Sequence, residues 1–297
     1  KKKVFDSVVM RLRDETPEGR KLKAQGLWKN LQDSSEIYNQ IISPKMGGDT
    51  GYYLEMLNGL MKSHRILMLN VLGSELPSND LAKVVRQLFV LGFRWVMSGG
   101  NAQELEDKFQ KLGNSFRDNR NAEALASELA TEALKLNTQS IELYLRQDAD
   151  EGYLGKAILH AINRARTPGA NEIPMSSDLH LEHIAPQTPT DHWKEVIFSG
   201  QSGEYENYDS VISQLGNLTL LDFKLNMSIK QKDFKSKSEK YAGSVIKLSN
   251  DLVKEDGWDL ESINSRTDYL VDCFNRVFSV ESRESQVPTF SDWKSRG

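Results

Sequence analysis

Apolar residues recur at helical spacing through the first half of the chain. Residues 57–72 place leucine, methionine and valine at positions i, i+3, i+4 and i+7, and residues 81–96 repeat the pattern. Such spacing gathers apolar side chains on one face of an α-helix, which is then buried against another element. Two further segments, 105–112 and 125–136, show the same periodicity. The first half therefore predicts a helical domain.

The composition limits the class of protein. The 297 residues include 38% hydrophobic and 27% charged residues, with a net charge of -4. These values suit one large or two ordinary globular domains. No apolar run approaches the roughly 18 residues needed to span a bilayer, so we expect a cytoplasmic protein with no membrane contact. The chain starts with three lysines and no methionine, and we expect that it begins inside a longer protein.

One cysteine and two histidines are expected in the core rather than at a site. Cys273 is the single cysteine, which excludes an internal disulfide and a four-cysteine zinc site. It lies on an apolar helical stripe, where a cysteine behaves as a small hydrophobic residue. His64 and His160 also lie among apolar residues at helical spacing. All three are predicted to be buried.

The pattern changes in the second half of the chain. Residues 178–184 alternate like a β-strand, and Pro186 ends the strand because proline cannot donate to a sheet ladder. A second strand is predicted at 217–221, followed by a helix over 226–241. These changes predict three regions: a helical domain at 1–150, a mostly helical domain at 151–280, and a polar, loosely held tail at 281–297.

One cluster of side chains offers the parts needed for phosphodiester hydrolysis. Histidine, with an ordinary pKa near 6.5, can take a proton from water at neutral pH. Carboxylate and amide oxygens can hold a hard divalent cation that neutralises the phosphate. The cluster lies on the first strand and on and after the second: His180, Glu182, His183, Asn217 and Asn226.

Other hydrolytic sites fit the same residues less well. A zinc metalloprotease needs two histidines at i and i+4 on one helical face, whereas His180 and His183 are i and i+3 on a strand and point to opposite faces. Glu182 and His183 are adjacent, so they also share a site only where the strand ends, twists or bulges. No Gly-x-Ser-x-Gly elbow is present for a serine nucleophile. On the residues alone, both a catalytic and a structural interpretation of the cluster stay open.

A basic segment follows the cluster. Residues 224–247 contain seven lysines against Asp233 and Glu239, a local balance of +5. A lysine run is commonly a solvated helix face, but its position after the cluster favours contact with phosphates. Lys230, Lys232 and Lys237 are the candidates for this contact.

Several of these residues form a pattern that resembles a known family. The run Leu181-Glu182-His183-Ile184-Ala185-Pro186-Gln187, the run Leu215-Gly216-Asn217-Leu218-Thr219-Leu220-Leu221, then Asn226 and Phe234-x-x-Lys237 resemble the C-terminal HNH domain of GmrSD-type restriction proteins. That family includes modification-dependent DNA endonucleases and SspE-like phage-defence effectors. The resemblance extends over about 152–278. It implies a mainly α fold that contains a small ββα-metal core (HNH, or His-Me finger).

The resemblance implies a role for each residue of the pattern. His183 would be the general base, and Glu182 and Asn226 would hold one Mg²⁺ or Mn²⁺ ion. Asn217 would hold the loop that carries the base. Lys237 matches a family lysine and would contact phosphate. His180 would support the site without touching the reacting groups, and the glutamate at position 182 departs from the aspartate of the related CRISPR nuclease motif.

The function implied is a divalent-metal-dependent DNA endonuclease or nickase that restricts foreign or phage DNA. Its partner would be double-stranded DNA from phage or plasmid, modified or not. The family's N-terminal nucleotide-dependent domain has no match in this chain, and two cuts by a single HNH site would call for a homo-oligomer. Two alternatives remain: a catalytically silent nucleic-acid-binding or regulatory module, and a metal-dependent RNase toxin.

Overall fold

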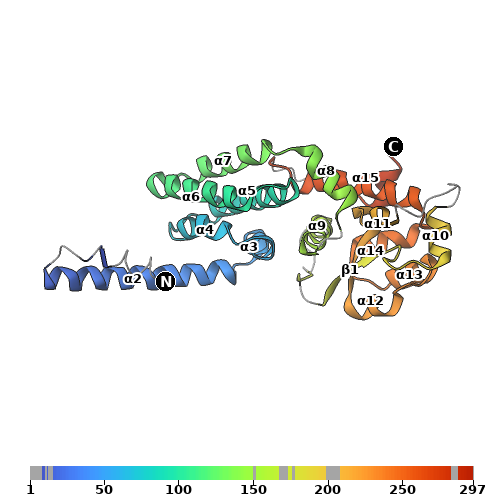
Figure 1. Ribbon diagram of the computed structural model, residues 1–297, viewed down its shortest axis with the longest axis horizontal. Helices are drawn as coiled ribbons and strands as arrows, with labels where there is room; N and C mark the ends of the chain where they lie inside the picture. Colours follow the sequence, from blue (N-terminus) through green and yellow to red (C-terminus); the bar gives the residue numbers. More distant parts are fainter. Residues whose placement is uncertain are drawn as a thin grey trace. The chain divides into compact units, whose positions relative to one another are not determined.

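The computed structural model describes residues 9–10, 12, 16–149, 152–166, 173–175, 178–198, 208–281 and 287–296. The fold is mainly helical and contains one small two-stranded sheet (Figure 1). The chain divides into two compact units, residues 1–89 with 101–127, and residues 90–100 with 128–297. The domain boundaries at 150 and 280 stay a prediction. No helix in the described ranges is both long enough and apolar enough to cross a membrane.

The first unit is built from helices joined by short connections. They are α2 (Pro17–Ile42), α3 (Gly48–Leu60), α4 (His64–Leu72), the first part of α5 (Ser78–Met97), α6 (Ala102–Asn119) and the start of α7 (Ala122–Leu134). The single helix predicted over 57–72 is wrong, because Met61 adopts an extended backbone conformation and separates α3 from α4. His64 is fully buried, and its burial lowers its pKa to about 4, so its imidazole is neutral. The prediction of a core histidine is confirmed.

The second unit holds the sheet and its supporting helices. The helices are α8 (Thr138–Gln147), α9 (Gly152–Ala165), α10 (Asp191–Ile197), α11 (Tyr208–Ile212), α12 (Phe223–Ile229), α13 (Phe234–Tyr241), α14 (Lys247–Asn250), α15 (Leu260–Val277) and α16 (Phe290–Lys294), with the 3₁₀ turns η2 (Leu215–Asn217) and η3 (Asp251–Lys254). Cys273 and His160 are buried in α15 and α9, as predicted.

The sheet pairs β1 (Leu179–His183) with β2 (Leu218–Asp222) in antiparallel register. Leu179 lies opposite Asp222 and His183 opposite Leu218, without a bulge between them. Helix α12 follows β2 directly, and α12 and α13 contact each other beside β1 (Figure 1). The single helix predicted over 226–241 is wrong, because α12 ends at Ile229 and the next residue, Lys230, has a φ of 36° in the left-handed region.

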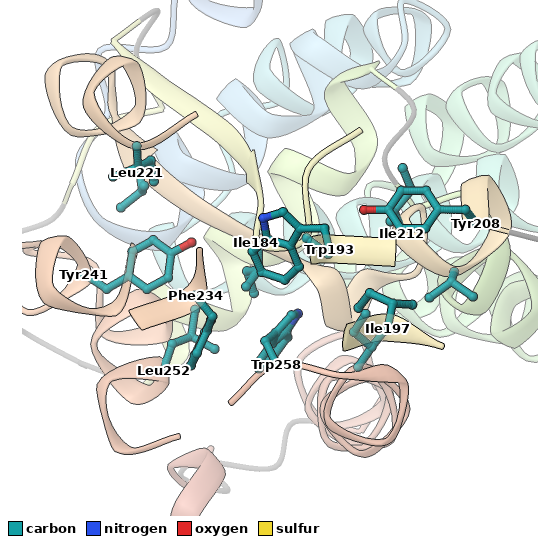
Figure 2. Close-up of a cluster of buried hydrophobic side chains, with 14 residues drawn as sticks. Ile184, Trp193, Ile197, Tyr208, Ile212, Leu221, Phe234, Tyr241, Leu252 and Trp258 are labelled. Atoms are coloured by element: carbon teal, nitrogen blue, oxygen red, sulfur yellow. The ribbon is translucent and has the colours of Figure 1, made fainter. Parts of the chain in front are cut away.

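A cluster of large apolar side chains forms the core behind the end of β1. Figure 2 shows Ile184 and Trp193 in the middle of this cluster. The rings of Phe234 and Trp258 stack with centroids 5.4 Å apart. Aromatic side chains of this size bury much apolar area and pack in a few orientations. The core therefore fixes the backbone that leaves β1.

The C-terminal segment packs on the second unit. Phe290 is 1% exposed. The Tyr269 hydroxyl donates a hydrogen bond to the Pro288 carbonyl (2.8 Å), and the Phe290 amide donates to the Asp251 carboxylate (3.3 Å). For residues 287–296 the expectation of a loosely held tail is wrong, because the polar composition of the tail conceals a buried aromatic anchor.

Candidate active site

His183 is the last residue of β1 and is partly exposed. Its neighbour Glu182 lies opposite Thr219 and is buried, with 6% of its surface exposed. Successive side chains of a strand point to opposite faces, and the regular register leaves this alternation intact. β1 has no bulge between Glu182 and His183, but it ends at His183, so the end of the strand is the expected condition that the structure meets.

Glu182 forms an ion pair with Lys237 of α13. The Lys237 ammonium lies 2.7 Å from the Glu182 carboxylate and also donates to the His183 carbonyl at 2.8 Å. Burial raises the pKa of Glu182 and lowers that of Lys237, and the opposite charge of each partner counters both shifts. A buried charge is strongly unfavourable without a partner, so each residue stabilises the other in its charged form.

Lys237 is buried, so it is not placed to make the contact with phosphate that was predicted from the sequence. Its side chain is 0% exposed, because Phe234, Lys237 and Tyr241 lie at i, i+3 and i+7 on the buried face of α13. This spacing is the signal in the sequence that could have indicated a buried lysine. Lys237 faces Glu182, whereas Lys230 and Lys232 are exposed, as a phosphate contact requires.

Asn217 holds the segment that follows His183. Its Oδ1 accepts hydrogen bonds from the Ala185 amide (2.8 Å) and from the Trp258 indole (3.1 Å). Its Nδ2 donates to the carbonyls of Ala185 (2.9 Å) and Ile212 (3.0 Å). The side chain is fully buried, and an amide makes at most two donor and two acceptor contacts of this kind. Asn217 therefore fixes the backbone two residues beyond His183.

Further hydrogen bonds immobilise the same loop. The Ile184 amide donates to the Asn217 carbonyl at 2.9 Å. The Tyr208 hydroxyl donates to the Pro186 carbonyl at 2.8 Å, and the Gln231 side chain donates to the Thr188 carbonyl at 3.0 Å. Tyr208 was not among the residues singled out from the sequence, and no local pattern around it indicates this contact.

Helix α15 supports Asn217 from behind. A Cβ atom at Gly216 would lie 2.2 Å from the Ile263 carbonyl oxygen and 2.3 Å from the Thr267 hydroxyl, so only glycine fits there. The Arg266 guanidinium donates to the carbonyls of Gly216 (2.5 Å) and Leu218 (2.7 Å). Burial lowers the pKa of Arg266 to about 10, which leaves it charged at neutral pH. These contacts explain the glycine and the asparagine of the run Leu-Gly-Asn-Leu.

Asn226 and His180 form no hydrogen bond with Glu182, Lys237 or Asn217 in the part of the chain that the structure describes. Asn226 lies within α12, half-buried, and its side chain makes no hydrogen bond within the described ranges. His180 shares the Glu182 face of β1, and its ring centroid lies 5.1 Å from that of Phe223. His180 therefore packs at the start of α12, at the end of the sheet away from His183.

The expected metal ligands fit a divalent ion only in part. Glu182 is almost fully buried and already neutralised by Lys237, whereas an Mg²⁺ site normally keeps several bound waters. Among the described residues, no group of three or more His, Cys, Asp and Glu side chains is placed to hold a metal. Asn226 has an amide oxygen that accepts no hydrogen bond from any residue the structure describes. As placed here, Glu182 does not fit the role of a metal ligand.

The sequence of the chain matches that of a known protein family. Residues 104–273 match the sequence model of the family described as GmrSD restriction endonucleases, C-terminal domain. The chain belongs to this family. The match covers more than half of the chain and includes both strands, α12, α13 and Arg266. A GmrSD C-terminal domain is thus the setting of the Glu182–Lys237 pair and of Asn217. No curated protein matches the sequence significantly.

Proposed function

We propose that this chain is an HNH-type nuclease that hydrolyses phosphodiester bonds of double-stranded DNA, with His183 as the general base. The observation that carries the proposal is the fixed backbone at and directly after a partly exposed histidine. Lys237 holds the His183 carbonyl, and Asn217 holds both backbone groups of Ala185. A catalytic group must be held in this way by rigid surroundings. The antiparallel pairing of β1 with β2, the helix α12 that follows β2 directly, and the family to which the chain belongs support the same assignment.

The reaction needs one base and one water. The neutral imidazole of His183 takes a proton from water, and the resulting hydroxide attacks phosphorus opposite the leaving oxygen. A new P–O bond forms as the bond to the 3′ oxygen breaks, and the departing alkoxide takes a proton from solvent. General base catalysis of this kind typically contributes roughly 100- to 10,000-fold in rate.

A divalent ion such as Mg²⁺ or Mn²⁺ would supply charge neutralisation at the phosphate. Asn226 is the residue here that is available to contribute an oxygen ligand. Glu182 would contribute only after Lys237 had moved away from it, so none of the steps above depends on such an ion. The metal requirement is a proposal to be tested with the ion added and removed.

The substrate assignment rests on the charge around α12 and α13. Lys224, Lys230, Lys232, Lys235 and Lys240 are exposed. None forms an ion pair with a carboxylate in the part of the chain that the structure describes. Lysines of this kind contact the phosphates of the DNA backbone and do not recognise individual bases. Restriction of phage or plasmid DNA, the gating of activity by a nucleotide-dependent domain, and a homo-oligomer for double-strand cuts belong to the same proposal.

Conversion of supercoiled plasmid to nicked or linear form tests the proposal. Reactions contain Mg²⁺, Mn²⁺ or EDTA, with the parent chain, His183→Ala and His192→Ala. His192 is exposed on α10 and lies outside the site, so its variant is the matched control. We expect cleavage by the parent and by His192→Ala, and none by His183→Ala.

The sequestered carboxylate of Glu182 favours one other function, a catalytically silent DNA-binding module. Such a module would bind DNA equally well with alanine at position 183 and would leave the plasmid intact under every condition. A metal-dependent RNase would cleave RNA while excess plasmid DNA left the rate unchanged. The same set of proteins separates the three functions.

A further inference from the structure

Helix α12 has two contrasting faces. Leu225 and Ile229 pack against the core, while Phe223 is 48% exposed and Met227 is 51% exposed. Positions 223, 226 and 227 follow i, i+3 and i+4, so Phe223, Asn226 and Met227 share one side of the helix. We call this side the α12 outer face. It combines two large apolar side chains with an amide.

Exposed apolar side chains are common on proteins, so the residues around them indicate whether they bind a ligand. The α12 outer face is bordered by Lys224, Lys230 and Lys232, all exposed. The nearest acidic residue after α12, Asp233, is committed to capping α13 through Ser236. Apolar side chains set in positive charge match a ligand that offers both an anionic backbone and flat apolar surfaces, and nucleic acid has both.

Helix α12 lies beside the strand that carries the candidate site. His180 of β1 contacts the Phe223 ring, and His183 lies three residues further along the same strand, a distance of roughly 10 Å. DNA whose phosphate lies near His183 would therefore bring neighbouring bases toward α12. Proteins that bind the minor groove of DNA often insert Phe, Leu, Ile or Met between base steps and partly unstack the bases.

We propose that Phe223 and Met227 act as an apolar wedge that opens a base step of the bound DNA. This inference rests on the proposed function and specifies which kind of DNA the site should bind most tightly. A duplex that is already weakened by a mismatch or a bulge needs less energy to open. Such DNA should bind more tightly than a fully paired duplex of the same length.

Binding measurements without cleavage test the wedge. All proteins carry His183→Ala, and fluorescence anisotropy reports binding to a paired duplex and to the same duplex with a central mismatch. We compare the parent with Phe223→Ala/Met227→Ala, and use Leu143→Ala as the control because Leu143 is exposed to a similar degree (52%) on α8. The double variant should bind the paired duplex roughly tenfold more weakly or worse, in keeping with base stacking on an aromatic side chain. The weakening should be smaller on the mismatched duplex.

The salt dependence of binding distinguishes the apolar contacts of Phe223 and Met227 from charge neutralisation by the lysines. The slope of log K against log salt should be unchanged in Phe223→Ala/Met227→Ala. In Lys224→Ala/Lys230→Ala the slope should fall by about 0.9 for each phosphate that a lysine no longer neutralises. A 2-aminopurine placed at the opened step should brighten on binding to the parent protein and stay dim with the wedge variant. Should the double variant unfold, Met227→Ala alone serves for every comparison.

The outcomes distinguish failure of the wedge from failure of the proposed function. If the parent binds DNA and the double variant binds both duplexes equally well, the wedge is wrong and the proposed nuclease stands. If the parent binds no DNA, both are wrong. If the parent binds anionic lipid vesicles instead, and the double variant loses that binding, the α12 outer face is a membrane contact and the wedge is likewise wrong.

Discussion

The Lys237 ammonium is fully buried and lies 2.7 Å from the Glu182 carboxylate. The same ammonium holds the carbonyl of His183. This pair links α13 to the end of β1, so a residue expected to meet DNA instead holds the backbone of the proposed base. The pair therefore has a structural role that its removal should reveal.

Replacing Lys237 by methionine should destabilise the protein. The change leaves the Glu182 carboxylate buried without a partner, which typically costs about 3–5 kcal/mol. Glu182→Gln/Lys237→Met removes both charges and should recover much of that stability. Urea unfolding of the two single variants and the double variant gives the coupling energy. A destabilisation of the double variant equal to the sum of those of the two single variants would contradict the pairing.

Replacing Asn217 by alanine should loosen the loop after His183. The variant leaves the Ala185 amide, the Trp258 indole and two carbonyls without their partner. An unsatisfied buried polar group costs about 1–3 kcal/mol. We expect a destabilisation of about 3 kcal/mol or more and faster hydrogen exchange at the Ala185 amide.

Asn217→Asp is the control for this loop. It keeps the acceptor oxygen for the Ala185 amide but loses the donors to Ala185 and Ile212. Exchange at the Ala185 amide should therefore be slower than in Asn217→Ala. Equal protection of that amide in the parent and in Asn217→Ala would contradict the role of Asn217 in holding this loop.

Gly216→Ala should be destabilising because the added methyl group meets backbone atoms of α15, which cannot move aside as a flexible side chain would. Overpacking of this kind typically costs about 1–3 kcal/mol. At Gly257 an added Cβ meets nothing within 4 Å, so Gly257→Ala is the matched control. Thermal unfolding should show a lower midpoint for the first variant alone. A similar midpoint for both would show that α15 is not packed on Gly216.

His64 should make the first unit sensitive to acid. Burial lowers its pKa from 6.5 to about 4, so the folded state resists protonation. Its full contribution to stability is present above pH 6.5 and is lost as the pH falls from 6.5 toward 4. A shift of this size corresponds to about 3 kcal/mol. His64→Leu should flatten the pH dependence of unfolding in that range, and an unchanged slope would contradict the assignment.

The helices and the two strands were largely predictable because their spacing is local. The break at Met61 was not, since apolar residues continue at helical spacing across it, and the break at Lys230 was not, since no glycine or proline marks it. The burial of Lys237 was readable from its spacing with Phe234 and Tyr241. The contacts of Tyr208, Trp258 and Arg266 were not, because each joins residues 22 to 50 positions apart. Such contacts depend on tertiary packing that no local pattern encodes.

The most direct test of the proposed nuclease is the single-turnover rate of plasmid nicking by the parent, His183→Ala and His192→Ala. Removal of a general base predicts a rate lower by at least about 100-fold for His183→Ala, with His192→Ala close to the parent. Far-UV circular dichroism and thermal unfolding establish that both variants are folded. Nicking that survives His183→Ala at the parent rate would contradict the assignment of His183 as the base.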